Sequence, residues 1–428
     1  MRALLLCLAL SLVFASTAGA APLTGFELRN GDSWTTHEEE LSFLKQVDRS
    51  SGRVAMEVIG KTAEGRPLHL VRVGDRPPSQ RRALGQPTVL LVCSQHGNEP
   101  AGREACLQAL RDLAFADDPA TLELLATRSF LFVPSANPDG RAANTRENSD
   151  GVDVNRDHLN LETPEARAMA AVVRDFRPEV ALDLHEYGPS IPGVYDDEVL
   201  YLWPRNLNID QQVHDLAETL GRDYVLRDSE EAGFSADEYG QYELAGNDIH
   251  QSAGDGDEGI MRNAMGLRHS LGVLVETAVT EDPRNTPMEL VSPAAVQRRR
   301  VAAHMNVVAS IFRFIRERGG QAEDVTSGAA LRKKLEGRSG SAPVYFGGAD
   351  NQEPAPEDVV DPPPCGYRLT REQLREQRTV LDLHGIRFKG SRGGAFVPMG
   401  QEAEPVIPLL LDGRGLRHSV EGRPLTDC

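Results

Sequence analysis

The sequence predicts an α/β fold in which a β-sheet is covered by helices on both faces. From residue 54 onward, blocks rich in β-branched residues alternate with blocks that have helical spacing. Several strand-like blocks are continuous apolar runs, as expected for strands that are buried on both faces. The composition agrees, because 40% hydrophobic and 26% charged residues in a chain of 428 are typical of a folded protein with a large core.

The first expected element is a hairpin, since residues 54–60 and 67–73 are β-rich runs separated by a turn-like segment. Further strands are expected at the apolar runs 86–94, 129–133, 180–184, 200–203 and 271–276. Helices are expected from their spacing at residues 101–115, 164–176, 207–221 and 292–318. Thr163 is a good N-cap for the second of these helices.

The composition changes after residue 318. Residues 319–341 are polar, and residues 347–364 are rich in Pro, Asp and Glu, which is typical of a linker. Beyond it, residues 367–384 suggest a helix and a short strand, and residues 395–411 are β-like. We therefore expect a signal peptide, a main domain, a linker and a small C-terminal accessory segment over residues 1–20, 21–320, 321–364 and 365–428.

The N-terminus has the marks of a cleaved export signal. Arg2 precedes the apolar run 3–15, and Ala18-Gly19-Ala20 forms a small-residue cleavage site. No later stretch reaches the roughly 18 apolar residues that a membrane helix needs, so we expect a secreted or periplasmic protein without a membrane span. The formal charge of −18 leaves no basic surface for a phosphate backbone, and nucleic acid is not expected as a partner.

Four cysteines remain after removal of the signal, in a compartment where disulfides persist. Cys365 and Cys428 bracket the last segment, and we favour a bridge between them. Cys93 and Cys106 could equally be buried thiols, so their state stays open. The chain has no C-x-x-C spacing, so any metal must be held by histidine and carboxylate side chains.

The first metal-binding candidate is the pair His96 and Glu99. It lies directly after a predicted strand and before a predicted helix, where α/β proteins place ligand groups. The same H-x-x-E spacing recurs at residues 37–40 and 418–421, but these lie in polar segments and are expected to be solvated charges. A catalytic zinc site keeps three protein ligands and one open position, so a third ligand is expected at another strand end.

His185 fits this third position, because the apolar run 180–184 stops at it. The same letters, Leu-Asp-Leu-His, end at His384 in the accessory segment. We favour His185, since it belongs to the alternating α/β part and Glu276 follows it along the chain. Glu276 ends an apolar strand, where a charge is costly to bury without a partner. It is either a solvent-facing strand end or, next to a metal-bound water, a general base.

A long polar loop carries two further candidates. Residues 137–156 are turn-rich, and long ordered loops are often functional. Arg146 and Arg156 within it could supply charge-assisted donors, one to an oxyanion and one as a bidentate clamp on a carboxylate.

Taken in order, these residues resemble the zinc carboxypeptidase A-like family. The matching pieces are residues 59–66, 96–99, 137–140, 145–157, 183–185 and Glu276. The resemblance covers roughly residues 30 to 318 and leaves out the accessory segment. It implies a zinc carboxypeptidase-like catalytic domain, built as a mixed central β-sheet flanked by helices on both faces.

The resemblance also implies the site residues, which are His96, Glu99 and His185 as ligands of one Zn²⁺ ion, Glu276 as catalytic base, Arg146 as oxyanion donor, Asn155 and Arg156 for the substrate's terminal carboxylate, and Asp153 to orient His96. The function implied is that of an exported zinc metallocarboxypeptidase, a peptide hydrolase. It would cleave the C-terminal bond of peptides that have a free C-terminal carboxylate, through a zinc-bound water activated by Glu276.

Other functions stay open at this point. A cell-wall peptide amidase or endopeptidase, or an N-acyl amino acid deacylase, would use the same ligands and Arg156. A catalytically inactive binding module would require the loss of a ligand or of the base, and all four residues are present.

Two features of the family's site are unassigned in this sequence. The family's mobile tyrosine has no counterpart between Ser252 and Glu276, and Tyr239 and Tyr242 are the nearest candidates. The preferred terminal residue is open as well, because Ile260 and Met261 suggest an apolar wall, whereas Asp255 and Asp257 suggest a basic substrate.

Overall fold

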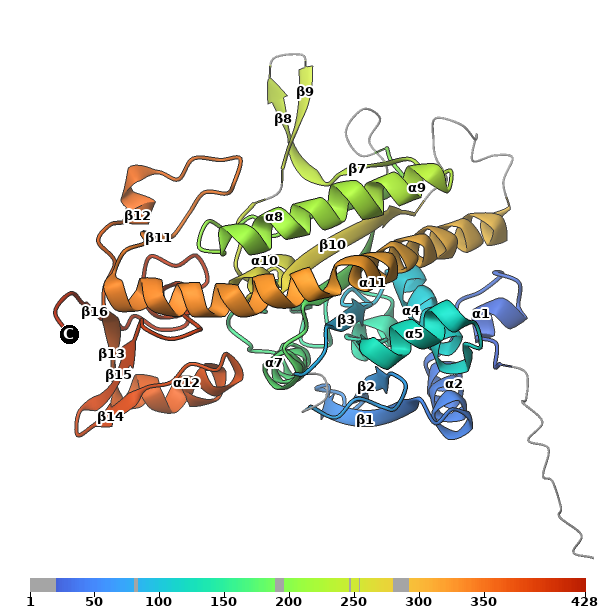
Figure 1. The fold of residues 1–428 in the computed structure, drawn as a ribbon, viewed down its shortest axis with the longest axis horizontal. Helices are drawn as coiled ribbons and strands as arrows, with labels where there is room; N and C mark the ends of the chain where they lie inside the picture. Colours follow the sequence, from blue (N-terminus) through green and yellow to red (C-terminus); the bar gives the residue numbers. More distant parts are fainter. Residues whose placement is uncertain (1–20, 81–83, 189–195, 246–247, 254, 280–291) are drawn as a thin grey trace, which may run out of the picture.

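The computed structural model describes residues 21–80, 84–188, 196–245, 248–253, 255–279 and 292–428. Its centre is an eight-stranded sheet in the order β1-β2-β4-β3-β5-β10-β6-β7 (Figure 1). The strands are β1 (Val54–Lys61), β2 (Pro67–Val73), β3 (Thr88–Cys93), β4 (Ser129–Val133), β5 (Val180–Tyr187), β6 (Val199–Leu202), β7 (Ala236–Glu238) and β10 (Leu271–Ala278). The four strands β4, β3, β5 and β10 are parallel, while β2 and β6 join them antiparallel. The predicted mixed sheet is therefore confirmed.

Helices cover both faces of this sheet because its central strands are apolar on both sides. In β3, Val89 and Leu91 belong to one buried cluster, whereas Leu90 and Val92 belong to another. The first cluster takes in residues of α2 (His37–Ser50), α4 (Pro100–Phe115), α8 (Gln211–Leu220) and α11 (Pro293–Ser339). The second contains residues of α7 (Pro164–Phe176) and α10 (Met261–Leu267).

Most predicted elements are present with bounds shifted by a few residues. Strand β4 and helix α7 have the predicted bounds, and the Thr163 hydroxyl accepts a hydrogen bond from Ala166 N as an N-cap.

The segment 37–40 was expected to be solvated, and this is wrong for Glu40. It lies in α2, is 2% exposed and pairs with the buried Arg103, 3.2 Å away. A buried charge of this kind needs its partner, which comes from distant α4.

Helix α11 differs most from the prediction, which ended it at residue 318 and placed a linker at 321–364. It continues to Ser339, so the first part of the predicted linker is helical. Ala322 and Ala329 are fully buried, and the Arg332 guanidinium lies 2.6 Å from Asp210. This tertiary packing outweighs the helix-weakening glycine pair at residues 319–320. The division into domains itself stays a prediction.

After α11 come the short strands β11 (Val344–Tyr345) and β12 (Val359–Val360), and then a small four-stranded sheet. The elements of the latter and its helices are β13 (Gly366–Thr370), α12 (Arg371–Leu383), β14 (Lys389–Ser391), β15 (Gly394–Pro398), α13 (Val406–Leu411) and β16 (Arg423–Leu425). The β-like reading of 395–411 is wrong in its second half, where α13 is helical. A short apolar run does not distinguish a strand from a buried helix.

The predicted bridge between Cys365 and Cys428 is confirmed, with Cα atoms 6.1 Å apart. Cys93 and Cys106, whose state was open, are also joined. The predicted signal peptide, residues 1–20, lies outside the described residues. Among the helices that the structure describes, none is long and apolar enough to cross a membrane.

The C-terminal segment lies beside the main part of the chain, with α12 next to α7 (Figure 1). The Arg174 guanidinium lies 2.7 Å from Asp382, and His384 Nε2 donates to the carbonyl of Leu159 at 2.7 Å. His384 therefore has a packing role and lies in no cluster of metal-ligating side chains among the described residues. The C-terminal segment thus makes direct contacts with α7 and with the loop that precedes it.

Candidate functional site

Three adjacent parallel strands bring the candidate residues to one edge of the sheet. Strands β3, β5 and β10 are neighbours, so their carboxyl ends meet, which is where α/β sheets bind ligands. The loop after β3 carries His96 and Glu99, and β5 and β10 carry His185 and Glu276. His185 and Glu276 are register partners, so their side chains point to the same face.

The loop that carries His96 depends on a close backbone contact. A Cβ atom at Gly97 would lie 1.9 Å from the carbonyl carbon of Gly140. Asn137 holds the two segments together, since its amide donates to Gln95 O at 3.0 Å and its oxygen accepts from Gly140 N at 2.8 Å. The segment 137–140, found in the sequence as a motif, therefore supports the loop of His96.

Three side chains converge at the centre of the site. His96 Nδ1 lies 2.8 Å from Glu99 Oε1, His185 Nδ1 lies 2.8 Å from Glu99 Oε2, and the two Nδ1 atoms are 3.0 Å apart. All three residues are at least nine-tenths buried. Glu99 immediately precedes α4, yet its side chain does not cap that helix and turns to the histidines instead. This is a compact donor set of two imidazoles and one carboxylate.

A second layer of acids fixes the orientation of both rings. Asp153 Oδ1 lies 3.1 Å from His96 Nε2, and Asp183 Oδ2 lies 2.8 Å from His185 Nε2. Each carboxylate accepts a hydrogen bond from the Nε2–H group of its ring, which leaves the Nδ1 lone pairs directed at the common point. Gln95 Nε2 donates to the other oxygen of Asp183 at 2.7 Å. The geometry therefore selects the tautomer that binds a metal through Nδ1.

The electrostatics of this cluster favour a positive charge at its centre. Burial alone would lower the pKa of His185, but Asp183 and Glu99 raise it well above its ordinary value. Burial likewise opposes ionisation of Glu99, yet the neighbouring histidines lower its pKa to about 2. A divalent cation satisfies the same carboxylates without protonating the imidazoles, so this donor set fits zinc.

Glu276 stands beside the donor set as an uncompensated acid. Its Oε2 atom is buried and has no hydrogen-bond partner among the described residues. Burial raises the pKa of Glu276 to about 7, with the charge of Glu99 acting in the same direction. A carboxyl group with a pKa near neutrality can both accept and release a proton.

The polar loop places both predicted arginines at the site. Arg146 Nη2 lies 3.0 Å from Asp153 and Nη1 lies 3.6 Å from Glu99, with the side chain 41% exposed. Arg156 is similarly exposed, at 39%, and its Nε lies 3.9 Å from Asp257. Both guanidiniums can therefore still reach a ligand.

Asn155 is buried below the site and uses both ends of its amide internally. Its oxygen accepts from Met261 N at 2.8 Å, and its nitrogen donates to Asp183 at 3.1 Å. Its predicted contact with a substrate carboxylate stays a prediction.

Tyr239, which sequence spacing left unassigned, follows β7 at the same site. Burial raises the pKa of Tyr239 to about 12, and the charges that act on it include Glu276, Arg156 and Arg146. Spacing alone could not separate Tyr239 from Tyr242, because β7 is only three residues long and carries no apolar run.

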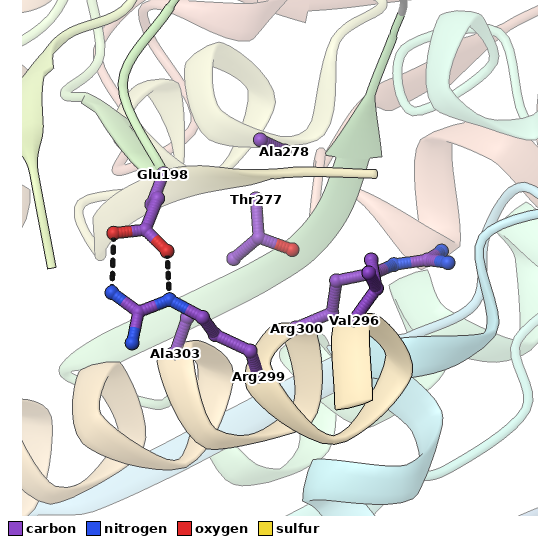
Figure 2. Close-up of a pocket in the computed structure, with 7 residues that line it drawn as sticks. All are labelled: Glu198, Thr277, Ala278, Val296, Arg299, Arg300 and Ala303. Carbon is purple, nitrogen blue, oxygen red and sulfur yellow. Dashed lines mark hydrogen bonds and ion pairs between the residues drawn. The ribbon is translucent and has the colours of Figure 1, made fainter. Parts of the chain in front are cut away.

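Helix α11 supports the strand ends from the opposite face. Figure 2 shows Arg299 paired with Glu198 at the start of β6, and Arg300 extending the other way. Arg300 Nε donates to Glu186, the residue after His185, at 2.6 Å. Thr277 Oγ1, next to Glu276, lies 2.8 Å from His304 Nε2. The sequence showed none of these supporting contacts.

A second group of metal-ligating types, His214, Asp215 and Glu218, lies on the surface of α8. Both ring nitrogens of His214 already face carboxylates, Asp350 at 2.7 Å and Asp215 at 3.1 Å. The buried group of His96, Glu99 and His185 is therefore the better candidate.

Comparisons with known proteins agree with this geometry. A family model described as zinc carboxypeptidase matches residues 40–258, just over half of the chain. Carboxypeptidase 2 of Trichophyton rubrum is 32% identical over 262 residues, which cover 58% of this chain and 48% of that protein. Carboxypeptidase SOL1 of Arabidopsis thaliana is 28% identical over 177 residues, 38% of this chain and 35% of that protein. The chain thus spans about half the length of the Trichophyton relative.

Solved structures give the same fold. A carboxypeptidase A-type protein from Shewanella denitrificans is similar with a TM-score of 0.50 and 20% identity, covering 66% of this chain and 70% of that one. A carboxypeptidase-type protein from Burkholderia mallei also has a TM-score of 0.50 and 20% identity, covering 65% and 68%. At this level of identity the likeness establishes the architecture of the sheet and its helices.

Proposed function

Because the chain belongs to the zinc carboxypeptidase family, we propose that it is a zinc-dependent metallocarboxypeptidase that removes the C-terminal residue of peptides. The observation that carries this proposal is the convergence of His96, Glu99 and His185 beside the uncompensated acid Glu276. The ligands and the acid come from three neighbouring strand ends, so the fold rather than a local motif assembles them.

His96, Glu99 and His185 would hold one zinc ion, and three protein ligands leave a position for water or substrate. When bound, zinc polarises a carbonyl as a Lewis acid and lowers the pKa of water. Asp153 and Asp183 hold the rings of His96 and His185 in the orientation that binding requires.

Glu276 would take a proton from the attacking water as the water oxygen bonds to the scissile carbonyl carbon. It would then deliver that proton to the leaving nitrogen as the carbon–nitrogen bond breaks. Arg146, partly exposed beside Glu99, would donate N–H groups to the developing oxyanion. A pKa of about 7 for Glu276 supports both proton transfers.

Arg156 would bind the terminal carboxylate of the substrate, as its exposed guanidinium allows. This contact restricts the enzyme to the last residue of a peptide. Tyr239, which follows β7, would close over the bound residue, since the charges of Glu276, Arg156 and Arg146 all act on it. Residues 1–20 support a secreted or periplasmic location, which mass spectrometry of the mature N-terminus in culture fractions would test.

The activity is tested with one peptide in two forms, with a free or an amidated C-terminus, in the presence and absence of a chelator. We expect the free peptide to lose its last residue, the amide to stay intact, and the chelator to abolish cleavage until zinc is restored. Cleavage of the amidated peptide would instead favour the amidase or endopeptidase alternative. Release of an acyl group from an N-acyl amino acid, without cleavage of the free peptide, would favour the deacylase.

A further inference from the structure

The C-terminal segment contributes a cation to the edge of the proposed site. Arg417 pairs through Nε and Nη2 with the two oxygens of Asp257, and its backbone N–H donates to Glu258 at 3.0 Å. Arg417 lies outside the range that the zinc carboxypeptidase model matches. A guanidinium that bonds both oxygens of one carboxylate is the strongest ion-pair geometry available to arginine.

The approach of Arg417 is built into the local backbone. A Cβ atom at Gly259 would lie 2.4 Å from Arg417 Cδ and also 2.4 Å from Arg156 O, so only glycine leaves room here. Ser419, two residues later, donates to Asn160 at 3.2 Å. The segment is thus held at Arg417 itself and again two residues after it.

Asp257 links Arg417 to the residue proposed to bind the substrate. Its Oδ2 lies 3.9 Å from Arg156 Nε, so Asp257 could compete with a substrate carboxylate for Arg156. It is 8% exposed, and Arg417 occupies both of its oxygens. The bidentate pair therefore leaves Arg156 available.

The other acids of this loop have partners as well. Asp255 lies 3.7 Å from the buried Arg262, and Glu258 accepts from Arg417 N. Arg262 Nε has no hydrogen-bond partner among the described residues. Asp255 and Asp257, the acids that suggested a basic substrate, thus each face an arginine, and buried Ile260 and Met261 lie next to them.

We propose that Arg417 is a positioning residue that neutralises Asp257, so that the site accepts peptides ending in an uncharged side chain and disfavours terminal lysine or arginine. This inference rests on the proposed function and names its substrate class. Loss of Arg417 would expose Asp257, which would attract a terminal lysine and compete for Arg156.

The test compares kcat/KM for two peptides that differ only in a terminal leucine or lysine. We expect the wild type to prefer leucine, and Arg417→Ala to lower the leucine-to-lysine ratio at least about tenfold, with a rise in KM for leucine. Asp257→Asn in the Arg417→Ala background should restore the ratio. Arg414→Ala is the matched control, because Arg414 pairs with Asp412 in the same segment at 2.8 Å.

Arg417→Gln removes the charge but keeps a polar side chain. It replaces the alanine variant in the same measurement if the alanine variant does not fold. An unchanged ratio in a folded Arg417 variant, or failure of the Asp257 substitution to restore it, contradicts this inference alone. A wild type that prefers lysine also contradicts it. A wild type that cleaves neither peptide contradicts the proposed function, and this inference with it.

Discussion

The direction of two imidazole rings decides what the centre of the site can hold. Asp153 and Asp183 accept from the Nε2 atoms of His96 and His185, so the Nδ1 atoms face each other across 3.0 Å. Two lone pairs this close repel unless a cation or a proton lies between them. With the carboxylate of Glu99 completing the set, the residues are arranged for a divalent ion.

Glu276→Gln tests the proposed role of Glu276 as the general base. The amide cannot accept the proton, so we expect kcat to fall about 10²–10⁴-fold. Zinc content, measured by elemental analysis, should stay at the wild-type level, because Glu276 is not among the three ligands. Full turnover by this variant would refute the role of the base.

Asp183→Asn tests whether the carboxylate of Asp183 supports metal binding by orienting the ring of His185. It removes the charge that holds His185, and we expect zinc affinity to fall about 10–100-fold in a competition titration with a chelator. Glu198→Gln is a matched control, since Glu198 is equally buried but pairs with Arg299 at the start of β6. Equal losses in both variants would mean that Asp183 has no specific effect on the metal.

The sequence predicted the proposed metal ligands and Glu276 better than the residues that surround them. His96, Glu99, His185 and Glu276 follow apolar runs, and strand ends of parallel sheets meet, so their convergence could be predicted. Gln95 could not, because nothing in its own neighbourhood marks it, and Tyr239 could be named only as one of two candidates. Their roles depend on side chains from other strands, such as Asp183 and Glu276.

Among the secondary-structure elements, helix α11 contacts the ends of three strands of the main sheet. It reaches β5 through the pair of Arg300 with Glu186 and β6 through the pair of Arg299 with Glu198 (Figure 2). His304 lies against Thr277 of β10. The helix thereby stabilises the strand ends that carry His185 and Glu276, although it contributes no residue to the site itself.

The glycines of α11 give a prediction about its stability. A methyl group at Gly320 would meet no atom within 4 Å, so Gly320→Ala should stabilise the protein by about 0.5–1 kcal/mol through helix propensity. Gly337→Ala is the matched control in the same helix. Its Cβ would lie 2.4 Å from the carbonyl oxygen of Met399, so we expect destabilisation.

The measurement is the urea midpoint of unfolding for the two variants and the wild type. A lower midpoint for Gly320→Ala would show that the helix is not continuous through this position.

Sequence patterns predicted the long elements and failed at short or interrupted ones. Apolar runs located β3, β4 and β5, whereas three-residue β7 gave no signal. The polar composition of residues 319–341 wrongly ended the predicted helix, because burial of Ala322 and Ala329 stabilises it and offsets a local penalty of about 1 kcal/mol per glycine. Local propensity does not contain that tertiary packing.

In the whole molecule, the C-terminal segment forms ion pairs with residues that lie far from it in the sequence. Arg417 and Asp257 are 160 residues apart in the sequence and still form an ion pair beside Arg156. Composition alone suggested a separate appendage here. A contact between such distant side chains has no periodicity that a sequence could display.

The packing of this segment predicts a dependence of stability on pH. Burial, with the charge of Arg268, lowers the pKa of His384 to about 3. Between that value and about 6.5 the unfolded chain binds a proton that the folded protein does not, so stability is lost as pH falls below about 6.5. Each such histidine contributes up to about 1.4 kcal/mol per pH unit.

His384→Gln isolates this contribution, because its amide can still donate to Leu159 O but does not titrate. The unfolding free energies of both proteins at pH 8 give the cost of the substitution when the histidine is neutral. Between pH 8 and pH 5 the variant should lose less stability than the wild type, by about 2 kcal/mol. Parallel pH curves would contradict the neutral state of buried His384.

Anomalous diffraction at the zinc edge, from crystals of the zinc-loaded protein, shows whether one zinc ion joins side chains from separate strand ends. We expect one strong peak at about 2.0–2.2 Å from His96 Nδ1, His185 Nδ1 and a Glu99 oxygen. A peak only at the exposed group of His214, Asp215 and Glu218, or no peak within reach of His96 and His185, would contradict it.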